Sequence, residues 1–248
     1  MFSNKTVIKK VLVISLILNL LFILVAAGFI YHKGGIDYIK RKAGVEKQDF
    51  PESYYQRLDV LNNLPEVDSA IVFVGNSIIE QCECAELFQN PKVLNRGISH
   101  DNIVGVINRE EQIVKLKPEL VFILIGINDL QGGLKVEKFK TDYTRMVNEL
   151  KQKLPATGIC LISILPSDDI IRKNEDIINA NLLIKEVSVK YDCKYIDLFD
   201  FFIKSNTLNP AYTDDGLHLN GNGYLKLKES LQRFIGGTKI SETIKTAK

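Results

Sequence analysis

The chain has 248 residues, of which 46% are hydrophobic and 25% are charged, the composition of an ordinary globular protein. Its net charge of +2, with no basic stripe, RNP-type motif or zinc-finger spacing, argues against a nucleic-acid-binding protein. Roughly 200 residues remain once an unusual N-terminal segment is set aside, which is enough for one domain with a sizeable core.

The N-terminal segment contains a long run without any charged residue, "VLVISLILNLLFILVAAGFI" at residues 11–30. As a helix it would span roughly 30 Å, the thickness of the hydrocarbon core of a bilayer. A short basic tail, residues 1–10, precedes it. The run predicts a single transmembrane anchor; a cleaved signal peptide is the alternative, because "VAA" at 25–27 resembles a processing site. Large domains translocate largely regardless of flanking charge, so we expect the main domain on the extracytoplasmic side.

Three further segments follow the predicted anchor. We expect a polar linker at residues 31–54, one globular domain at 55–238 and a flexible tail at 239–248. The spacing of the cysteines, with no histidine cluster nearby, argues against a metal site, and nothing in the sequence requires a disulfide. The four cysteines are Cys82, Cys84, Cys160 and Cys193.

Short apolar runs alternate with amphipathic patterns along the globular domain. The runs typical of buried strands are 70–75, 92–97, 119–126, 158–165 and 193–198, and the helical patterns are 101–116, 135–154, 174–191 and 223–235. Asp101 is the expected N-cap of the first of these helices. The alternation predicts an α/β fold with a mostly parallel five-stranded sheet that is covered by helices on both faces.

The first strand ends in "VGNSIIE", where Ser77 opens a helix at the carboxyl edge of the sheet. Ligands bind beyond this edge in parallel sheets. A serine there offers an exposed hydroxyl, and its own N–H belongs to the unpaired donors of a helix N-terminus. These are the needs of an acyl-transfer nucleophile. The alternative is that Ser77 is only a helix N-cap.

The next two strands also end in residues that can donate hydrogen bonds. Gly97 follows the second strand in "LNRGISHDN" and can present its backbone N–H to a ligand. Asn128 follows the third strand in "LIGINDL" and can donate from its side-chain amide to a developing oxyanion. The alternative for both is an ordinary turn residue.

One loop near the C-terminus carries a histidine with a carboxylate three positions before it. Asp215 and His218 are spaced so that the carboxylate can hold one imidazole nitrogen, while the other accepts a proton from a serine. Asp214 lies four positions before His218, which is one position too far for this arrangement. Of the other histidines, His32 lies at the edge of the predicted membrane segment, and His100 lies near Gly97.

Together the four segments, "GNSI", "NRGIS", "GIND" and "DDGLHLN", resemble the four sequence blocks of the SGNH hydrolases, also called GDSL-type esterases and lipases. They occur in the family order and cover nearly all of residues 70–235. The resemblance implies a flavodoxin-like three-layer α/β/α fold and a serine esterase mechanism without metal or cofactor. The sequence around the second and third blocks is especially similar to that of the acetylhydrolase and carbohydrate-esterase branch.

The resemblance also implies a role for each candidate residue. Ser77 is the expected nucleophile, His218 the base and Asp215 the acid of the triad. The Ser77 N–H, the Gly97 N–H and the Asn128 side chain form the expected oxyanion hole. The implied substrate is a carboxylic ester with a short acyl group, carried by an acetylated glycan or a lipid, close to the membrane that holds residues 11–30.

One residue departs from the family pattern, because Asn76 stands where the family usually has aspartate.

Two other functions stay open beside hydrolysis. An O-acyltransferase acting on an envelope glycan would use the same triad. A membrane-tethered binding module would retain the triad residues but have only weak catalytic activity. The segment around Ser77 is neither G-x-G-x-x-G nor a P-loop, which argues against a nucleotide-binding site.

Overall fold

The computed structural model describes residues 3–32, 50–131 and 133–235. The chain divides into two compact units, residues 1–49 and 50–248, and each is described by itself. Most of the expected linker, 31–54, lies outside the described residues, and so does the expected tail, 239–248. The last residues of that expected linker form the start of helix α3 (Glu52–Asn63).

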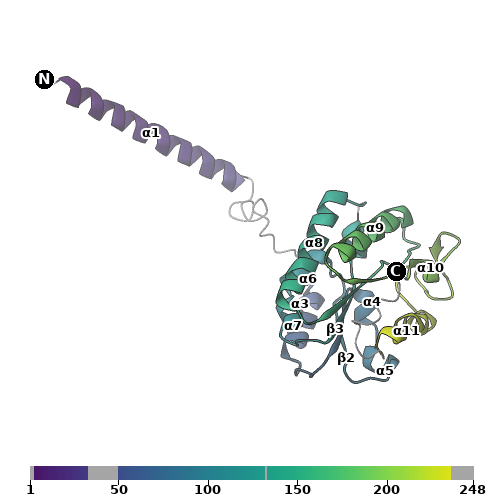
Figure 1. Cartoon of the computed structure of the whole chain (residues 1–248). Coiled ribbons are helices and arrows are strands. Elements are labelled where there is room, and N and C mark those ends of the chain that lie inside the picture. Colours follow the sequence, from purple (N-terminus) through teal and green to yellow (C-terminus); the bar gives the residue numbers. More distant parts are fainter. Residues whose placement is uncertain (1–2, 33–49, 132, 236–248) are drawn as a thin grey trace. The chain divides into compact units, whose positions relative to one another are not determined.

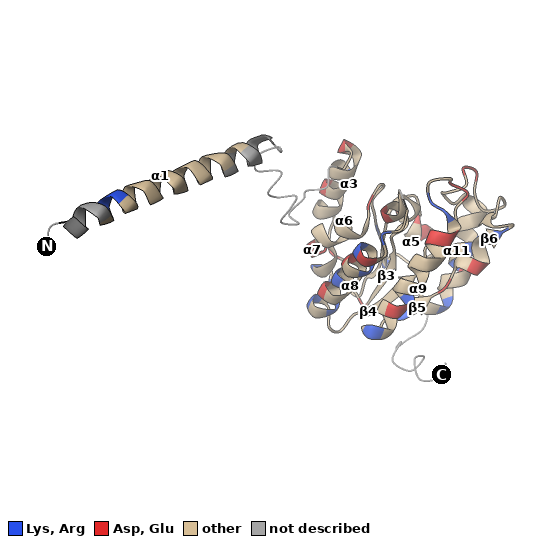
Figure 2. Cartoon of the chain, turned by 90° about the horizontal axis from the view of Figure 1, so that it is seen from above, with Lys and Arg blue, Asp and Glu red and all other residues tan. Residues whose placement is uncertain are grey.

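The N-terminal unit contains one long helix, α1 (Ser3–His32). Residues Ile8–Val25 have a mean hydropathy of 2.5 and are long and apolar enough to cross a membrane, although a signal sequence would share these properties. In Figure 2 the blue, basic residues of α1 lie only toward its start, and the residues after them that are drawn in colour are neither basic nor acidic. Helix α1 includes the apolar run at residues 11–30, which was expected to be helical.

The second unit is built on a five-stranded sheet in which every neighbouring pair is parallel, in the order β2-β1-β3-β4-β5 (Figure 1). The strands are β1 (Ile71–Gly75), β2 (Val93–Gly97), β3 (Leu120–Leu124), β4 (Gly158–Ile162) and β5 (Lys194–Ile196). Gly75 at the end of β1 is in register with Gly97 of β2 and Leu124 of β3. This strand order is the flavodoxin-like one, so the residues that follow β1, β2 and β3 come together at one edge.

Helices cover both faces of the sheet, because the strands alternate their buried side chains between two apolar clusters. One cluster joins the sheet to α6 (Ile103–Asn108), α7 (Glu111–Val114), α8 (Val136–Lys153) and α9 (Asn174–Lys190). The other joins it to α4 (Ser77–Glu80), α5 (Cys84–Leu87), α10 (Phe199–Phe202) and α11 (Gly221–Ile235). The predicted three-layer α/β/α fold is confirmed.

The elements differ from the sequence predictions mainly at their ends. Strand β3 stops at Leu124, two residues earlier than predicted, and Gly126 then adopts a φ of 122°, a left-handed conformation that suits glycine. A short 3-10 helix, η1 (Ile127–Leu130), follows. The hairpin of β6 (Ile203–Lys204) and β7 (Thr207–Leu208) was not predicted.

The predicted helix at 101–116 is wrong, because the chain forms the two short helices α6 and α7 there. Asn102, not Asp101, is the N-cap, and its side-chain Oδ1 accepts from the Gly105 N–H. Asp101 turns inward instead, and its carboxylate accepts from Arg109 Nε at 2.8 Å. Both side chains are buried. A buried carboxylate needs a partner of this kind, and that need decided the local geometry.

Candidate active site

Ser77 is the first residue of α4 and lies directly beyond the end of β1. The N-cap of α4 is Asn76, whose side-chain oxygen accepts from the Ile78 N–H at 3.0 Å. The alternative that Ser77 is itself the cap is therefore wrong. The Ser77 hydroxyl oxygen lies 2.9 Å from Nε2 of His218, which is 141 residues further along the chain. This is a hydrogen-bond distance at which a base can accept the hydroxyl proton.

His218 also contacts Asp215, whose Oδ2 lies 2.6 Å from the ring Nδ1. The other carboxylate oxygen accepts from the backbone N–H groups of His218 and Leu217 at 2.8 and 2.9 Å. Partial burial alone would raise the pKa of the Asp215 carboxyl, but these hydrogen bonds outweigh it and hold that pKa well below its usual range. Asp215 therefore stays ionised and fixes the imidazole orientation. Asp214 does not take this position; its nearest described partner is Asn220.

The loop that carries Asp215 and His218 is held by the segment that follows β4. Gly216 has a φ of 79°, and its carbonyl accepts from the Asp168 N–H at 2.8 Å. A Cβ added at Gly216 would lie 2.8 Å from the Asp168 side chain, so glycine is required for both reasons. The sequence reasoning did not identify Asp168, because only the tertiary structure brings these two loops together.

Gly97 lies at the end of β2, but its N–H is not free. It donates to the side-chain oxygen of Asn95 at 2.8 Å. A Cβ at Gly97 would lie 2.2 Å from the backbone nitrogen of Glu80, so the glycine allows β2 and α4 to approach closely. This geometry explains the glycine by packing and gives no support to its predicted use as an oxyanion donor.

The loop after β2 still offers one free donor, the N–H of His100. The other N–H groups from Gly97 to Ile103 donate to acceptors, whereas that of His100 has none among the residues that the structure describes. His100 is exposed and has a φ of 66°. A left-handed residue other than glycine is uncommon, and this turn leaves the backbone N–H of His100 without an intramolecular acceptor among the described residues. The Ser77 N–H likewise has no acceptor in the described part of the chain.

Asn128 lies in η1 and points its amide toward the same loop. Its Nδ2 donates to the carbonyl of Asp101 at 2.8 Å, which leaves the second hydrogen of that nitrogen available. Its Oδ1 faces Nη2 of Arg172 at 3.5 Å, and Arg172 pairs with Asp169 in the segment after β4. These contacts orient the amide, and the sequence reasoning identified neither Arg172 nor Asp169.

The carboxylate next to Asn128 titrates near neutral pH. Burial raises the pKa of Asp129 to about 7, although the Ile103 N–H, which donates to it, acts in the opposite direction. The nearby Asp101 carboxylate raises the pKa further. The folded protein therefore binds a proton at Asp129 under conditions in which the unfolded chain, with a pKa of about 4, does not.

This shift predicts a pH-dependent stability. Between about pH 4 and 7 the folded state binds more protons than the unfolded state, so the free energy of unfolding falls as pH rises. Asp129→Asn keeps the size of the side chain and removes the titration. The free energy of unfolding of both proteins is measured by urea unfolding at several pH values. We expect the difference, variant minus wild type, to rise from pH 4 to 7 and then to level off. A difference that does not change with pH would contradict the shift.

The described residues contain no group of three or more His, Cys, Asp or Glu that could hold a metal ion. The four cysteines are free thiols. Burial raises the pKa of Cys160 to about 12 and that of Cys193 to about 11. A thiol must ionise to act as a nucleophile, so these two cysteines do not compete with Ser77.

The chain is similar to known proteins over part of their length. The chain is 29% identical over 204 residues to an N-acylneuraminate cytidylyltransferase of Escherichia coli, matching 79% of this chain and 48% of that protein. It is 27% identical over 150 residues to a multidomain esterase of Ruminococcus flavefaciens, matching 57% and 19%. The chain thus spans half or less of the length of these relatives.

A solved GDSL-like lipase from Bacteroides thetaiotaomicron has the same fold, with a TM-score of 0.65 and 24% identity over 73% of this chain and 96% of that one. The profile of the GDSL-like lipase/acylhydrolase family matches residues 73–226. That range contains every residue that contributes to the site described above, from Asn76 to His218. The chain therefore belongs to the GDSL-like lipase/acylhydrolase family.

Proposed function

We propose that the protein hydrolyses carboxylic esters through an acyl-enzyme on Ser77. The observation that carries the proposal is the chain of contacts from Ser77 Oγ to His218 Nε2 and from His218 Nδ1 to Asp215 Oδ2, at 2.9 and 2.6 Å. Nucleophile, base and orienting acid in this order are the arrangement of serine hydrolases. Membership of the GDSL-like lipase/acylhydrolase family supports the same reaction.

In the first half of the reaction, Ser77 Oγ attacks the ester carbonyl carbon while its proton moves to His218 Nε2. The Nδ1–H of the ring donates to Asp215, whose negative charge stabilises the imidazolium that forms. The tetrahedral intermediate then collapses. The bond to the alcohol oxygen breaks, the alcohol leaves with the proton from His218, and the acyl group remains on Ser77.

In the second half, a water molecule replaces the alcohol. His218 accepts a proton from the water as its oxygen attacks the acyl carbon, and a second tetrahedral intermediate forms. Its collapse returns the proton to Ser77 Oγ and releases the carboxylic acid. An acyltransferase would use a sugar hydroxyl in place of this water, and product analysis separates the two reactions.

The proposed oxyanion hole combines three donors from the segments that follow β1, β2 and β3. They are the N–H of Ser77, the free hydrogen of Asn128 Nδ2 and the N–H of His100. We assign His100 in place of Gly97, because the Gly97 N–H already donates to Asn95. Donors that are already oriented toward the oxyanion position before the reaction stabilise the developing negative charge without reorganisation.

We propose further that residues 11–30 anchor the protein in a membrane as a single span, with the catalytic domain on the extracytoplasmic side. The apolar helix of the N-terminal unit supports this proposal. The natural substrate would then be an ester of a short acyl group on a glycan or lipid close to the membrane surface.

Labelling with a fluorophosphonate tests the proposed nucleophile directly. We expect the full-length protein to form an adduct that mass spectrometry locates on Ser77, since only an activated serine reacts readily with this probe. The adduct should be lost in His218→Ala, which removes the base. An adduct on another residue, or one that persists in His218→Ala, would contradict the mechanism.

A further inference from the structure

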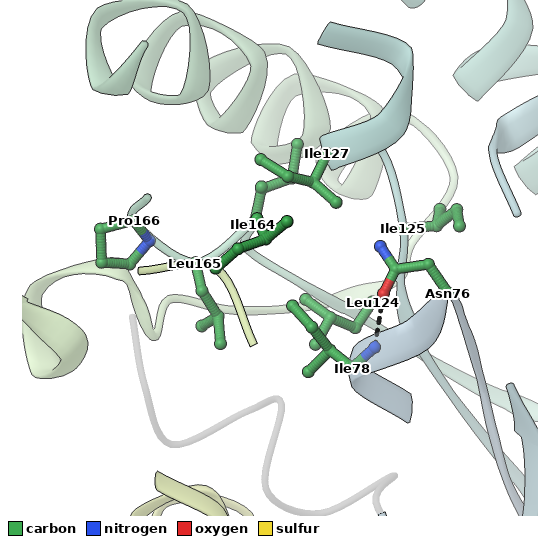
Figure 3. Close-up of a pocket in the computed structure, with 9 residues that line it drawn as sticks. Asn76, Ile78, Leu124, Ile125, Ile127, Ile164, Leu165 and Pro166 are labelled. Carbon is green, nitrogen blue, oxygen red and sulfur yellow. Dashed lines mark hydrogen bonds between the residues drawn. The ribbon is translucent and has the colours of Figure 1, made fainter. Parts of the chain in front are cut away.

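A small cavity lies beside the candidate active site (Figure 3). Three of its lining residues are the chain neighbours of residues in the proposed mechanism: Ile78 follows Ser77, Ile127 precedes Asn128 and Leu217 precedes His218. The segment after β4 closes it with Ile164, Leu165 and Pro166. The cavity is therefore bordered by the elements that would surround the carbonyl carbon of a bound ester.

Asn76 is the only polar residue among the nine that line this cavity. It is 1% exposed, and its side-chain oxygen is occupied as the cap of α4. The other end of the amide, Nδ2, is buried and has no hydrogen-bond partner among the described residues. Figure 3 shows this nitrogen pointing into the cavity, toward Ile127 and Ile164.

A buried N–H without a partner is costly, and native proteins rarely keep one without a reason. The space open to the centre of a water-sized sphere in this cavity is about 10 Å³, which suits one water-sized group. The donor and the space together fit a single oxygen atom held among apolar side chains. The aspartate that usually stands at this position in the family would not offer this donor when ionised.

We propose that an oxygen on the carbon next to the ester carbonyl of the substrate enters this cavity and accepts a hydrogen bond from Asn76 Nδ2. The preferred acyl class is then hydroxyacetyl or a similar short 2-oxygenated acyl group, in preference to a plain alkanoyl group of the same size. The inference rests on the proposed function, because it describes the substrate class of the same site.

The test compares two esters of the same alcohol, hydroxyacetyl and propionyl 4-methylumbelliferone, whose acyl groups have the same number of non-hydrogen atoms beyond the carbonyl. The measured quantity is the ratio of their kcat/KM values in the full-length protein and in two variants. Asn76→Asp at pH 8 keeps the cap and the size of the side chain but removes the amide donor. Asn76→Ser keeps a capping oxygen and withdraws it from the cavity.

We expect the hydroxyacetyl-to-propionyl ratio to fall about tenfold in both variants, the scale for one lost hydrogen bond that leaves a buried partner unmatched. The intrinsic reactivity of the two esters cancels, because each variant is compared with the wild type on the same pair. A ratio that stays within about twofold of the wild type in both variants would overturn the inference.

The same experiment separates this inference from the proposed function. If propionyl ester hydrolysis continues in wild type and variants while the ratio is unchanged, only the acyl preference is wrong. If the wild-type protein hydrolyses neither ester, the proposed function fails, and the acyl preference fails with it.

Discussion

Replacing Ser77 by alanine is expected to lower kcat for ester hydrolysis by about 10⁴- to 10⁶-fold, the scale for loss of a triad member in serine hydrolases. The substitution removes the oxygen that would carry the acyl group, and no other described nucleophile contacts His218. The measurement is the steady-state rate of the purified full-length protein with a fluorogenic short-chain ester.

A matched control is Ser230→Ala on α11. That hydroxyl donates to the carbonyl of Lys226 within the same helix and does not contact the triad. Its removal should leave kcat within about twofold of the wild type, because a surface change of this kind rarely alters a distant site. Near wild-type turnover in Ser77→Ala, with Ser230→Ala equally active, would show that the reaction does not use this serine.

The second large effect is expected at Asn128. Asn128→Ala removes the proposed side-chain donor to the oxyanion, and we expect kcat to fall by about 10²- to 10³-fold with a much smaller change in KM. The reason is that the oxyanion forms only in the transition state, so the lost hydrogen bond weakens substrate binding very little. Initial rates over a range of ester concentrations separate the two constants.

Asn179→Ala provides the control for this change. Asn179 is an exposed residue of α9, and the substitution removes the same chemical group without touching the site. It should leave both constants unchanged. A rise in KM with an unaltered kcat in Asn128→Ala would mean that Asn128 binds the ester equally in both states and is not an oxyanion donor.

Much of the fold could be predicted from the sequence. The apolar runs around Phe73, Phe122 and Leu161 identify strands that are buried on both faces, because a strand inside a parallel sheet contacts helices on each side. The end of a strand, as before Gly126, does not follow from its apolar run, because the point where a strand stops depends on contacts with neighbouring loops.

Several residues of the candidate site were also identified in the sequence. Ser77, Asn128 and His218 could be found because each lies in a short motif just after a strand or before the last helix. A parallel sheet brings the carboxyl ends of its strands to one edge, so local pattern and topology together predict that these residues meet.

Other features of the site depend on contacts between distant residues. The sequence shows Gly97 and His100 three positions apart but does not show which N–H is free. That depends on the side chain of Asn95, which accepts from Gly97, and on the left-handed turn at His100. Hydrogen-bond partners of this kind are set only when the loop packs against the rest of the domain.

The sequence by itself determined the alternation of strands and helices, the apolar N-terminal segment and the motif residues Ser77, Asp215 and His218, because these follow from local composition and spacing. The tertiary structure decided that the free side-chain nitrogen of Asn76 lies in a cavity lined by distant residues such as Ile127 and Ile164. It also decided that Arg172 reaches Asn128. Both depend on packing between segments far apart in the chain, which no local pattern encodes.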